Sequence, residues 1–203
     1  MVLDRRVKRT RNLLREAVLE LAETQDLTEM TVQDITRRAD VNRATFYQHY
    51  RDKDELVEQT IDDLLEELFG GCAPVLAGRD RLMPDAVHPS VVAMFREVGR
   101  RAGLYRRLVG HGGSAYFISR FQTRNEELFL RAWRLLDIPE DDVRIPSMVR
   151  ARFAASAALG LFSYWLEQGQ VESAETMAAW LWRLTRPAWF ETIGMETAMA
   201  LDG

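Results

Sequence analysis

The residues best suited to chemical recognition lie between positions 43 and 50, where the chain reads RATFYQHY. This segment crowds hydrogen-bond donors and flat rings onto about two helical turns: Arg43, Thr45, Tyr47, Gln48, His49 and Tyr50. Arginine pairs with the edge of guanine through two hydrogen bonds, and hydroxyl and imidazole groups bond to phosphate oxygens. A helix that only filled a core would not carry so many polar aromatic side chains. The segment is therefore suited to contact with a nucleic-acid duplex.

Two short helices joined by a tight turn are needed to present these side chains. Over residues 31–39 apolar and small residues recur at helical spacing, and Thr31 can cap the first turn by accepting backbone N–H bonds. Asp40 to Asn42 breaks this helix. Val41 can fill the angle between the helices, and Asn42 is a good N-cap for a second helix over residues 43–49. Residues 31–53 thus predict a helix-turn-helix with Lys53 at the start of the next helix.

This stretch, TVQDITRRADVNRATFYQHYRDK, resembles the helix-turn-helix of the TetR/AcrR family of bacterial transcription regulators. The residues in register with the family pattern are Thr31, Ile35, Ala39, Val41, Thr45, Tyr47, His49 and Lys53, with Tyr50 in place of Phe. The departures are Thr36 for Ala, Asp40 for Gly, Asn42 for Ser and Ala44 for Gly. Asp40 matters most, because a residue leaving a helix here can require the left-handed backbone that Asp tolerates better than most.

The resemblance continues into the C-terminal half. LYRRLVGHGG (104–113) and GLFSYWLEQG (160–169) resemble a subgroup typed with regulators of dihydroxyacetone kinase. By this resemblance the protein is a homodimer that binds double-stranded DNA at a palindromic operator. Register then assigns Arg43 to a base edge and Ala44 and Thr45 to close approach or a thymine methyl group. The residues assigned to phosphates are Thr31, Tyr47, His49 and Lys53.

Composition and charge agree with a helical protein that meets phosphate at one end. With only 6 prolines and 12 glycines among 203 residues, and with long amphipathic stretches, we expect an all-α fold of about nine helices. The net charge is −4, yet residues 1–53 hold 11 Lys and Arg against 9 Asp and Glu, whereas the rest hold 16 against 22. Charge is thus polarised along the chain. By itself, the basic run over residues 5–11 is equally compatible with a solvated arm.

The sequence shows no recognisable pattern of catalytic residues. It contains no CxxC, HExxH, GxSxG or Gly-rich phosphate loop, and His49, His88 and His111 are scattered, so we expect no catalytic residue, metal or cofactor. Cys72 is the only cysteine, which suits a reducing cytoplasm. The charged start and the lack of an apolar run of about 20 residues indicate neither a signal peptide nor a membrane span.

We divide the chain into a helix-turn-helix domain (1–53), a connecting helix (52–69) and a C-terminal regulatory and dimerisation domain (70–203). A first helix over residues 4–24 has a predicted buried face of Leu13, Leu14, Ala17, Val18, Leu21 and Ala22. The stretch 70–88 contains Gly and Pro and is the expected linker. Five further helices follow, one starting at His88-Pro89-Ser90 and a long one capped by Ser114 and stopped at 137–139.

The last two expected helices, over residues 147–169 and 173–194, carry more apolar surface than one small domain needs. They therefore predict a four-helix interface with a second copy. The interface residues expected are Ala154, Ala158, Gly160, Trp180, Leu181 and Leu184. The alternative is that both helices serve only the core of one chain.

Many members of the family enclose a small molecule among their middle helices. The candidate lining residues here are Phe95, Tyr105, Phe117, Phe121, Trp133, Phe153, Phe162 and Trp165. An aromatic stripe at helical spacing also serves as ordinary core, so the effector and its identity stay open. Our interpretation is a homodimeric repressor released by a ligand. The alternatives are a TetR-fold adaptor that acts mainly through a protein partner, and a helical enzyme or ligand carrier without a catalytic constellation.

Overall fold

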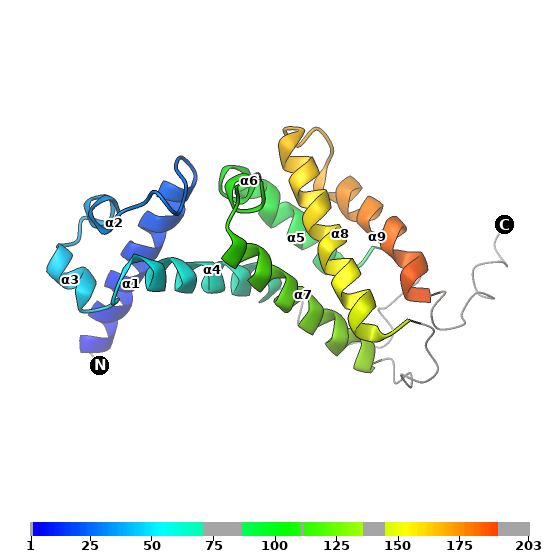
Figure 1. The fold of residues 1–203 in the computed structure, drawn as a ribbon, viewed down its shortest axis with the longest axis horizontal. Helices are drawn as coiled ribbons and strands as arrows, with labels where there is room; N and C mark the ends of the chain where they lie inside the picture. The colour runs from blue at the N-terminus through cyan, green and yellow to red at the C-terminus, as the bar shows by residue number, and fades with distance from the viewer. Residues whose placement is uncertain (1, 71–86, 111, 136–144, 191–203) are drawn as a thin grey trace.

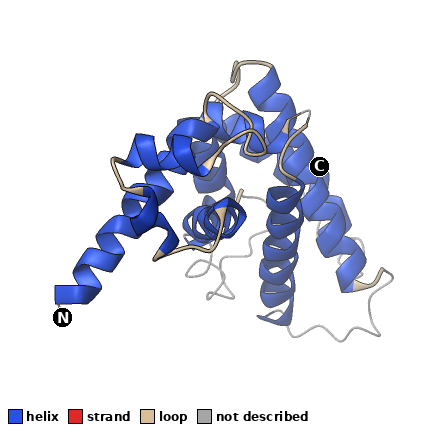
Figure 2. Cartoon of the chain, turned by 60° about the vertical axis from the view of Figure 1, so that its left-hand side comes forward, coloured by secondary structure: helices blue, strands red, loops and turns tan. Residues whose placement is uncertain are grey.

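The computed structural model describes residues 2–70, 87–110, 112–135 and 145–190, and within these ranges every regular element is a helix (Figures 1 and 2). The helices are α1 (Val2–Ala22), α2 (Val32–Ala39), α3 (Arg43–Tyr47), α4 (Lys53–Gly70), α5 (Pro89–Arg100), α6 (Ala102–Val109), α7 (Ala115–Leu135), α8 (Ser147–Glu167) and α9 (Ala174–Phe190). The predicted all-α fold is confirmed. Cys72, His111, most of the expected linker, the helix stop at 137–139 and the expected end of the last helix at 194 lie outside the described residues.

Local capping chemistry sets the ends of α2 and α3. Thr31 accepts the backbone N–H of Asp34 at 3.2 Å, and Asp34 accepts the N–H of Thr31 in return, which makes a capping box. The predicted cap of α3 is also confirmed, because the side chain of Asn42 accepts the N–H of Ala44 at 2.8 Å. Between them Asp40 adopts the left-handed conformation, with φ 52° and ψ 44°. The turn angle therefore depends on a residue that tolerates this backbone.

We expect Asp40→Val to lower the free energy of unfolding by about 1–2 kcal/mol, because a β-branched side chain is strained in the left-handed region. Asp40→Gly should leave stability unchanged or raise it, since glycine adopts this conformation without strain. Urea denaturation of both variants measures the difference. The control Gln33→Val, at an exposed position of α2, should change stability by less than about 0.5 kcal/mol. An equal loss in the two valine variants would contradict the backbone argument.

The buried face of α1 differs from the prediction at its edges. Leu14, Ala17, Val18 and Ala22 are buried as expected, but Leu13 is 43% exposed. The buried arc extends instead to Leu19 on the other side. The reason is the placement of α2, α4 and α6, which all contact α1 and determine which arc they cover.

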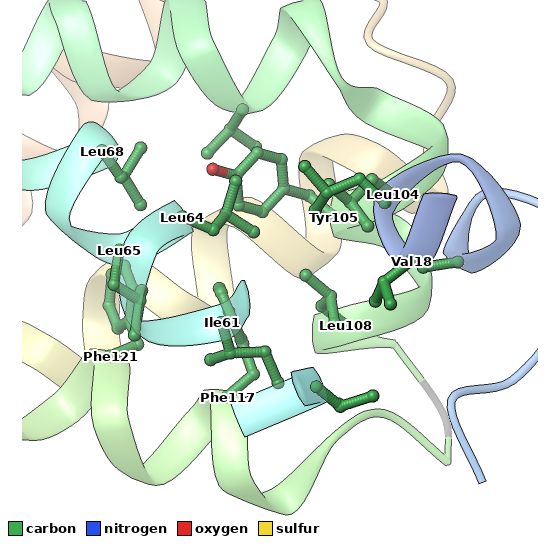
Figure 3. Packing of buried hydrophobic residues seen from close by; sticks show 14 of the residues in the cluster. Val18, Ile61, Leu64, Leu65, Leu68, Leu104, Tyr105, Leu108, Phe117 and Phe121 are labelled. Atoms are coloured by element: carbon green, nitrogen blue, oxygen red, sulfur yellow. The ribbon is translucent and has the colours of Figure 1, made fainter. Parts of the chain in front are cut away.

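One continuous hydrophobic core joins the N-terminal helices to the C-terminal bundle, and α4 runs through it (Figure 1). Figure 3 shows residues of four helices converging there: Val18 of α1; Ile61, Leu64, Leu65 and Leu68 of α4; Leu104, Tyr105 and Leu108 of α6; Phe117 and Phe121 of α7. Helix α4 therefore packs against α1 on the N-terminal side and against α7 of the C-terminal bundle.

The acidic face of α4 is held by arginines from both sides. Arg15 of α1 donates to Glu67 at 2.6 Å, and Arg120 of α7 donates to Asp62 at 2.7 Å. Each pair is partly exposed and worth little alone. Together they link α4 to α1 on one side and to α7 on the other.

Helices α5 to α9 form the C-terminal bundle, in which α8 packs on α6, α7 and α9 and α5 packs on α9 (Figure 1). The predicted helix starts are confirmed: the side chain of His88 accepts the N–H of Ser90, Pro89 is the first residue of α5, and Ser114 accepts the N–H of Phe117 at 3.2 Å. Among the described helices, none is long and apolar enough to cross a membrane.

Candidate nucleic-acid interface

Helix α3 buries one side chain in the core and exposes most of its other side chains to solvent. Phe46 is completely buried and packs edge-on against Tyr47, with ring centroids 5.3 Å apart. Around it Arg43 and Ala44 are exposed, Thr45 is half-buried and Tyr47 is 48% exposed. A single apolar residue therefore fixes a five-residue helix whose outer surface consists of the predicted contact residues.

Arg43 and Tyr47 form a pair one helical turn apart. The Arg43 guanidinium lies over the Tyr47 ring, 5.6 Å from its centroid, and its Nη2 donates to the Tyr47 hydroxyl at 3.2 Å. Stacking on an aromatic ring limits the conformations of the arginine but leaves most of its five N–H donors unused. The structure thus brings together the residue predicted to read a base and one predicted to hold a phosphate.

Thr31 and His49, two of the predicted phosphate contacts, meet specific constraints. The Thr31 hydroxyl donates its proton to Asp34 at 2.6 Å, so a phosphate contact by this group requires a change of partner. Burial lowers the pKa of His49, and the nearby charge of Arg11 lowers it further. Both effects favour the uncharged imidazole, which can still form a hydrogen bond to a phosphate.

Lys53, at the start of α4, has a structural role that the sequence did not reveal. Its ammonium group donates to the backbone carbonyls of Leu27 and Thr28, both at 3.1 Å, and so holds the loop between α1 and α2. These bonds use two of its three N–H donors. The ammonium group also lies 3.7 Å from the Asp54 carboxylate, so a phosphate would share its charge with Asp54 and would accept its third N–H.

Lys53→Met is expected to lower the free energy of unfolding by about 1 kcal/mol, because the two loop carbonyls lose their donor. It should also weaken binding to all DNA sequences alike and reduce the salt slope of binding by about one unit. Binding titrations at several salt concentrations and urea denaturation measure the two effects separately. Arg131→Met, an equal charge removal on the exposed surface of α7, should leave the slope unchanged. An unaltered slope in Lys53→Met would exclude a phosphate contact.

Arg11 is a candidate contact residue that sequence reasoning did not single out. Its guanidinium lies 5.8 Å from the centroid of the Tyr50 ring, next to the helix-turn-helix. The signal was present as the basic run over residues 5–11, which could equally be a solvated arm. Because α1 packs against α2 and α4, the fold places Arg11 beside the helix-turn-helix and not on a separate arm.

Among the described residues, no group of three or more His, Cys, Asp or Glu side chains is placed to hold a metal ion.

Comparisons with known proteins agree with the geometry. Residues 14–60 match the family described as bacterial regulatory proteins, tetR family, and residues 85–186 match a family described as transcriptional regulator C-terminal region. The chain belongs to the TetR family. The family is one of transcriptional regulators, and the resemblance drawn from residues 31–53 and from the C-terminal half is confirmed.

Three similar proteins illustrate the comparison. An uncharacterized HTH-type transcriptional regulator of Bacillus subtilis, YxbF, is 27% identical over 177 residues; the match covers 87% of this chain but 44% of YxbF, so this chain spans less than half of that protein. The crystal structure of a TetR regulator from Streptococcus agalactiae is 26% identical, with TM-score 0.67 and coverage of 91% of this chain and 98% of the other. The dihydroxyacetone kinase operon activator DhaS shares the fold at 17% identity, with TM-score 0.59 and coverage of 87% and 93%.

The TetR-type C-terminal bundle contains a cavity of about 140 Å³, and only part of the predicted ligand lining faces it. Phe95 and Phe162 line it. Tyr105, Phe117, Phe121 and Trp165 are buried in the continuous core and do not line this cavity. Phe153 is 53% exposed and does not line this cavity. The side chain of Trp133 lies outside the described residues.

The predicted dimer residues also divide between two surfaces. Ala154, Ala158 and Leu181 line the internal cavity, and Ala158 is only 2% exposed within the protomer. Gly160, Trp180 and Leu184 line a hollow on the outer surface of α8 and α9 instead. On α8 this outer surface continues with exposed apolar residues at helical spacing, namely Val149, Phe153 and Tyr164. We call these six residues the outer α8–α9 face.

Proposed function

We propose that this regulator is a homodimeric repressor that binds an inverted-repeat operator and is released by a small-molecule effector. The observation that supports it most directly is the exposed pair of Arg43 and Tyr47 on α3, with Phe46 buried beneath. A regulator of this kind acts in the cytoplasm. Within the chain we propose a DNA-binding domain (1–53), a connecting helix and a regulatory and dimerisation domain (70–203).

A symmetric dimer presents two copies of α3 to successive major grooves on one side of the duplex. The operator should then have half-site centres about one helical turn or slightly more apart. In each half-site Arg43 reads a base edge, Ala44 and Thr45 allow close approach, and Tyr47, His49 and Lys53 hold phosphates. Thr31 joins them if its hydroxyl leaves Asp34.

The outer α8–α9 face supports dimerisation. Leu184 is 65% exposed and Trp180 37% exposed, although both are large apolar residues on a helix that packs into a bundle. They border a hollow beside Gly160, where no side chain keeps an approaching helix away. Contiguous apolar surface of this kind marks an interaction site. A second copy, related by two-fold symmetry, covers it with the same face.

The internal cavity supports control by an effector. Its lining includes Phe69, in the last turn of α4, together with residues of α5, α7, α8 and α9. The Phe69 ring packs on Phe121, with centroids 5.2 Å apart, so the cavity adjoins the junction between α4 and α7. An effector can release the dimer from DNA only if it binds more tightly to a conformation in which the two α3 helices no longer match successive major grooves.

A gel-shift titration with the DNA upstream of the protein's own gene tests the proposal. We expect a symmetric footprint over an inverted repeat, with binding to this site at least about a thousandfold tighter than to random DNA. Equal affinity for both would exclude an operator-binding regulator and favour an adaptor that works through a protein partner. A promoter fusion with and without the protein then distinguishes repression from activation, the role that the name of DhaS records for that protein.

A further inference from the structure

We propose that the internal cavity selects a compact, uncharged and largely apolar molecule, about the size of one substituted six-membered ring, and reads its single hydrogen-bonding group with Asn125. This inference rests on the proposed function, because it names the chemical class of the effector. Three properties of the cavity support this assignment: its volume, the charge of its wall and the polar groups that line it.

The size of the cavity limits the ligand. Its volume is about 140 Å³, and an apolar cavity of roughly 150 Å³ admits one benzene molecule. The main apolar groups on its wall are Phe69, Met94, Phe95, Leu128, Phe162 and Leu181. A single ring with one or two small substituents fills this volume.

The charge of the wall excludes ions. Among the described residues that line the cavity, none is Asp, Glu, Lys, Arg or His. Transfer of an unpaired carboxylate or ammonium group from water into such a site is strongly unfavourable, and the group would instead lose its charge. The wall therefore discriminates against organic acids and amines of the same shape.

Four side chains with polar groups line the cavity, namely Ser90, Asn125, Trp182 and Thr185. Trp182 already has an interaction of its own. The Ser90 hydroxyl lies 2.6 Å from Nδ1 of His88, and the Thr185 hydroxyl donates to the carbonyl of Leu181 at 2.8 Å. Asn125, on α7, is half-buried and its amide makes no hydrogen bond to any described residue. A primary amide both donates and accepts, so it can bond to a hydroxyl, carbonyl or amide on the ligand.

Calorimetric titration of the full-length protein, without DNA, tests the class with four probes of similar shape: toluene, phenol, benzoate and benzylamine. We expect saturable binding of toluene and phenol at one molecule per protomer. Benzoate and benzylamine should bind at least about tenfold more weakly than toluene, because their charges find no partner. Binding of either ion as tight as that of toluene, or no saturable binding of both neutral probes, would overturn the proposal.

The variant Asn125→Leu tests whether the Asn125 amide recognises the hydrogen-bonding group of the ligand. It keeps the size of the side chain and removes the amide, so toluene should still bind, while the ratio of phenol to toluene affinity falls about three- to tenfold. An unchanged ratio would exclude Asn125. Ala158→Leu, which fills the cavity, should abolish binding of both neutral probes; circular dichroism verifies that it folds, and Asn125→Leu decides the matter if it does not.

The gel-shift titration separates this inference from the proposed function. Specific operator binding with no neutral-ring binding would overturn the inference alone. Ring binding by a protein with no preferred DNA site would overturn the regulator proposal and leave the cavity chemistry standing.

Discussion

Leu184→Glu should sediment as a monomer and lose operator binding at concentrations where the parent protein saturates its site. Leu184 is 65% exposed in the protomer and belongs to the outer α8–α9 face, so the substitution leaves the core of the protomer intact. In a packed dimer interface it would bury an unpaired carboxylate at a cost of several kcal/mol. One reading head contacts too few bases to hold an operator alone, whereas linkage makes the second contact effectively intramolecular.

Sedimentation velocity, circular dichroism and gel-shift titration measure this result together. Val171→Glu is the matched control, because Val171 is 80% exposed in the turn between α8 and α9 and should tolerate the charge. A Leu184→Glu protein that stays dimeric would place the interface elsewhere, and a monomer with parental affinity would exclude the two-headed mechanism. Ala158→Glu is unsuitable for this purpose, because Ala158 is buried within the protomer.

Arg43→Ala should cost about 1–3 kcal/mol of operator binding and relax the preference at one base pair in each half-site. Arg43 is the long donor at the N-terminal end of α3, and its contact with Tyr47 aims the guanidinium outward before DNA arrives. The matched variant Tyr47→Phe keeps the ring under Arg43 but removes the hydroxyl. It should therefore weaken binding to all sequences alike and leave the base preference unchanged.

Competition binding against operators substituted one position at a time measures both variants. Equal loss of affinity on operator and random DNA in Arg43→Ala would reassign Arg43 to the phosphate backbone. A changed base preference in Tyr47→Phe would show that the hydroxyl, and not only the ring, positions the arginine.

The sequence alone determined the local architecture of the helix-turn-helix. Thr31 and Asn42 cap their helices through residues two or three positions away, and the left-handed backbone of Asp40 follows from its place after α2. Such features depend on interactions within one helical turn, so residue type and spacing are sufficient to predict them. The match to residues 31–53 was specific for the same reason, because a short recognition unit keeps its chemistry in consecutive residues.

Which side of each C-terminal helix is buried depends on tertiary packing, and the sequence pattern alone does not show it. Periodicity correctly indicated that α8 is apolar on more than one side, but it could not say that Ala158 faces the cavity while Gly160 faces outward. It likewise could not show that Phe153 is exposed or that Lys53 holds the carbonyls of Leu27 and Thr28. The physical reason is that a helix rotates to bury whichever arc its neighbours cover, and those neighbours lie far away in the chain.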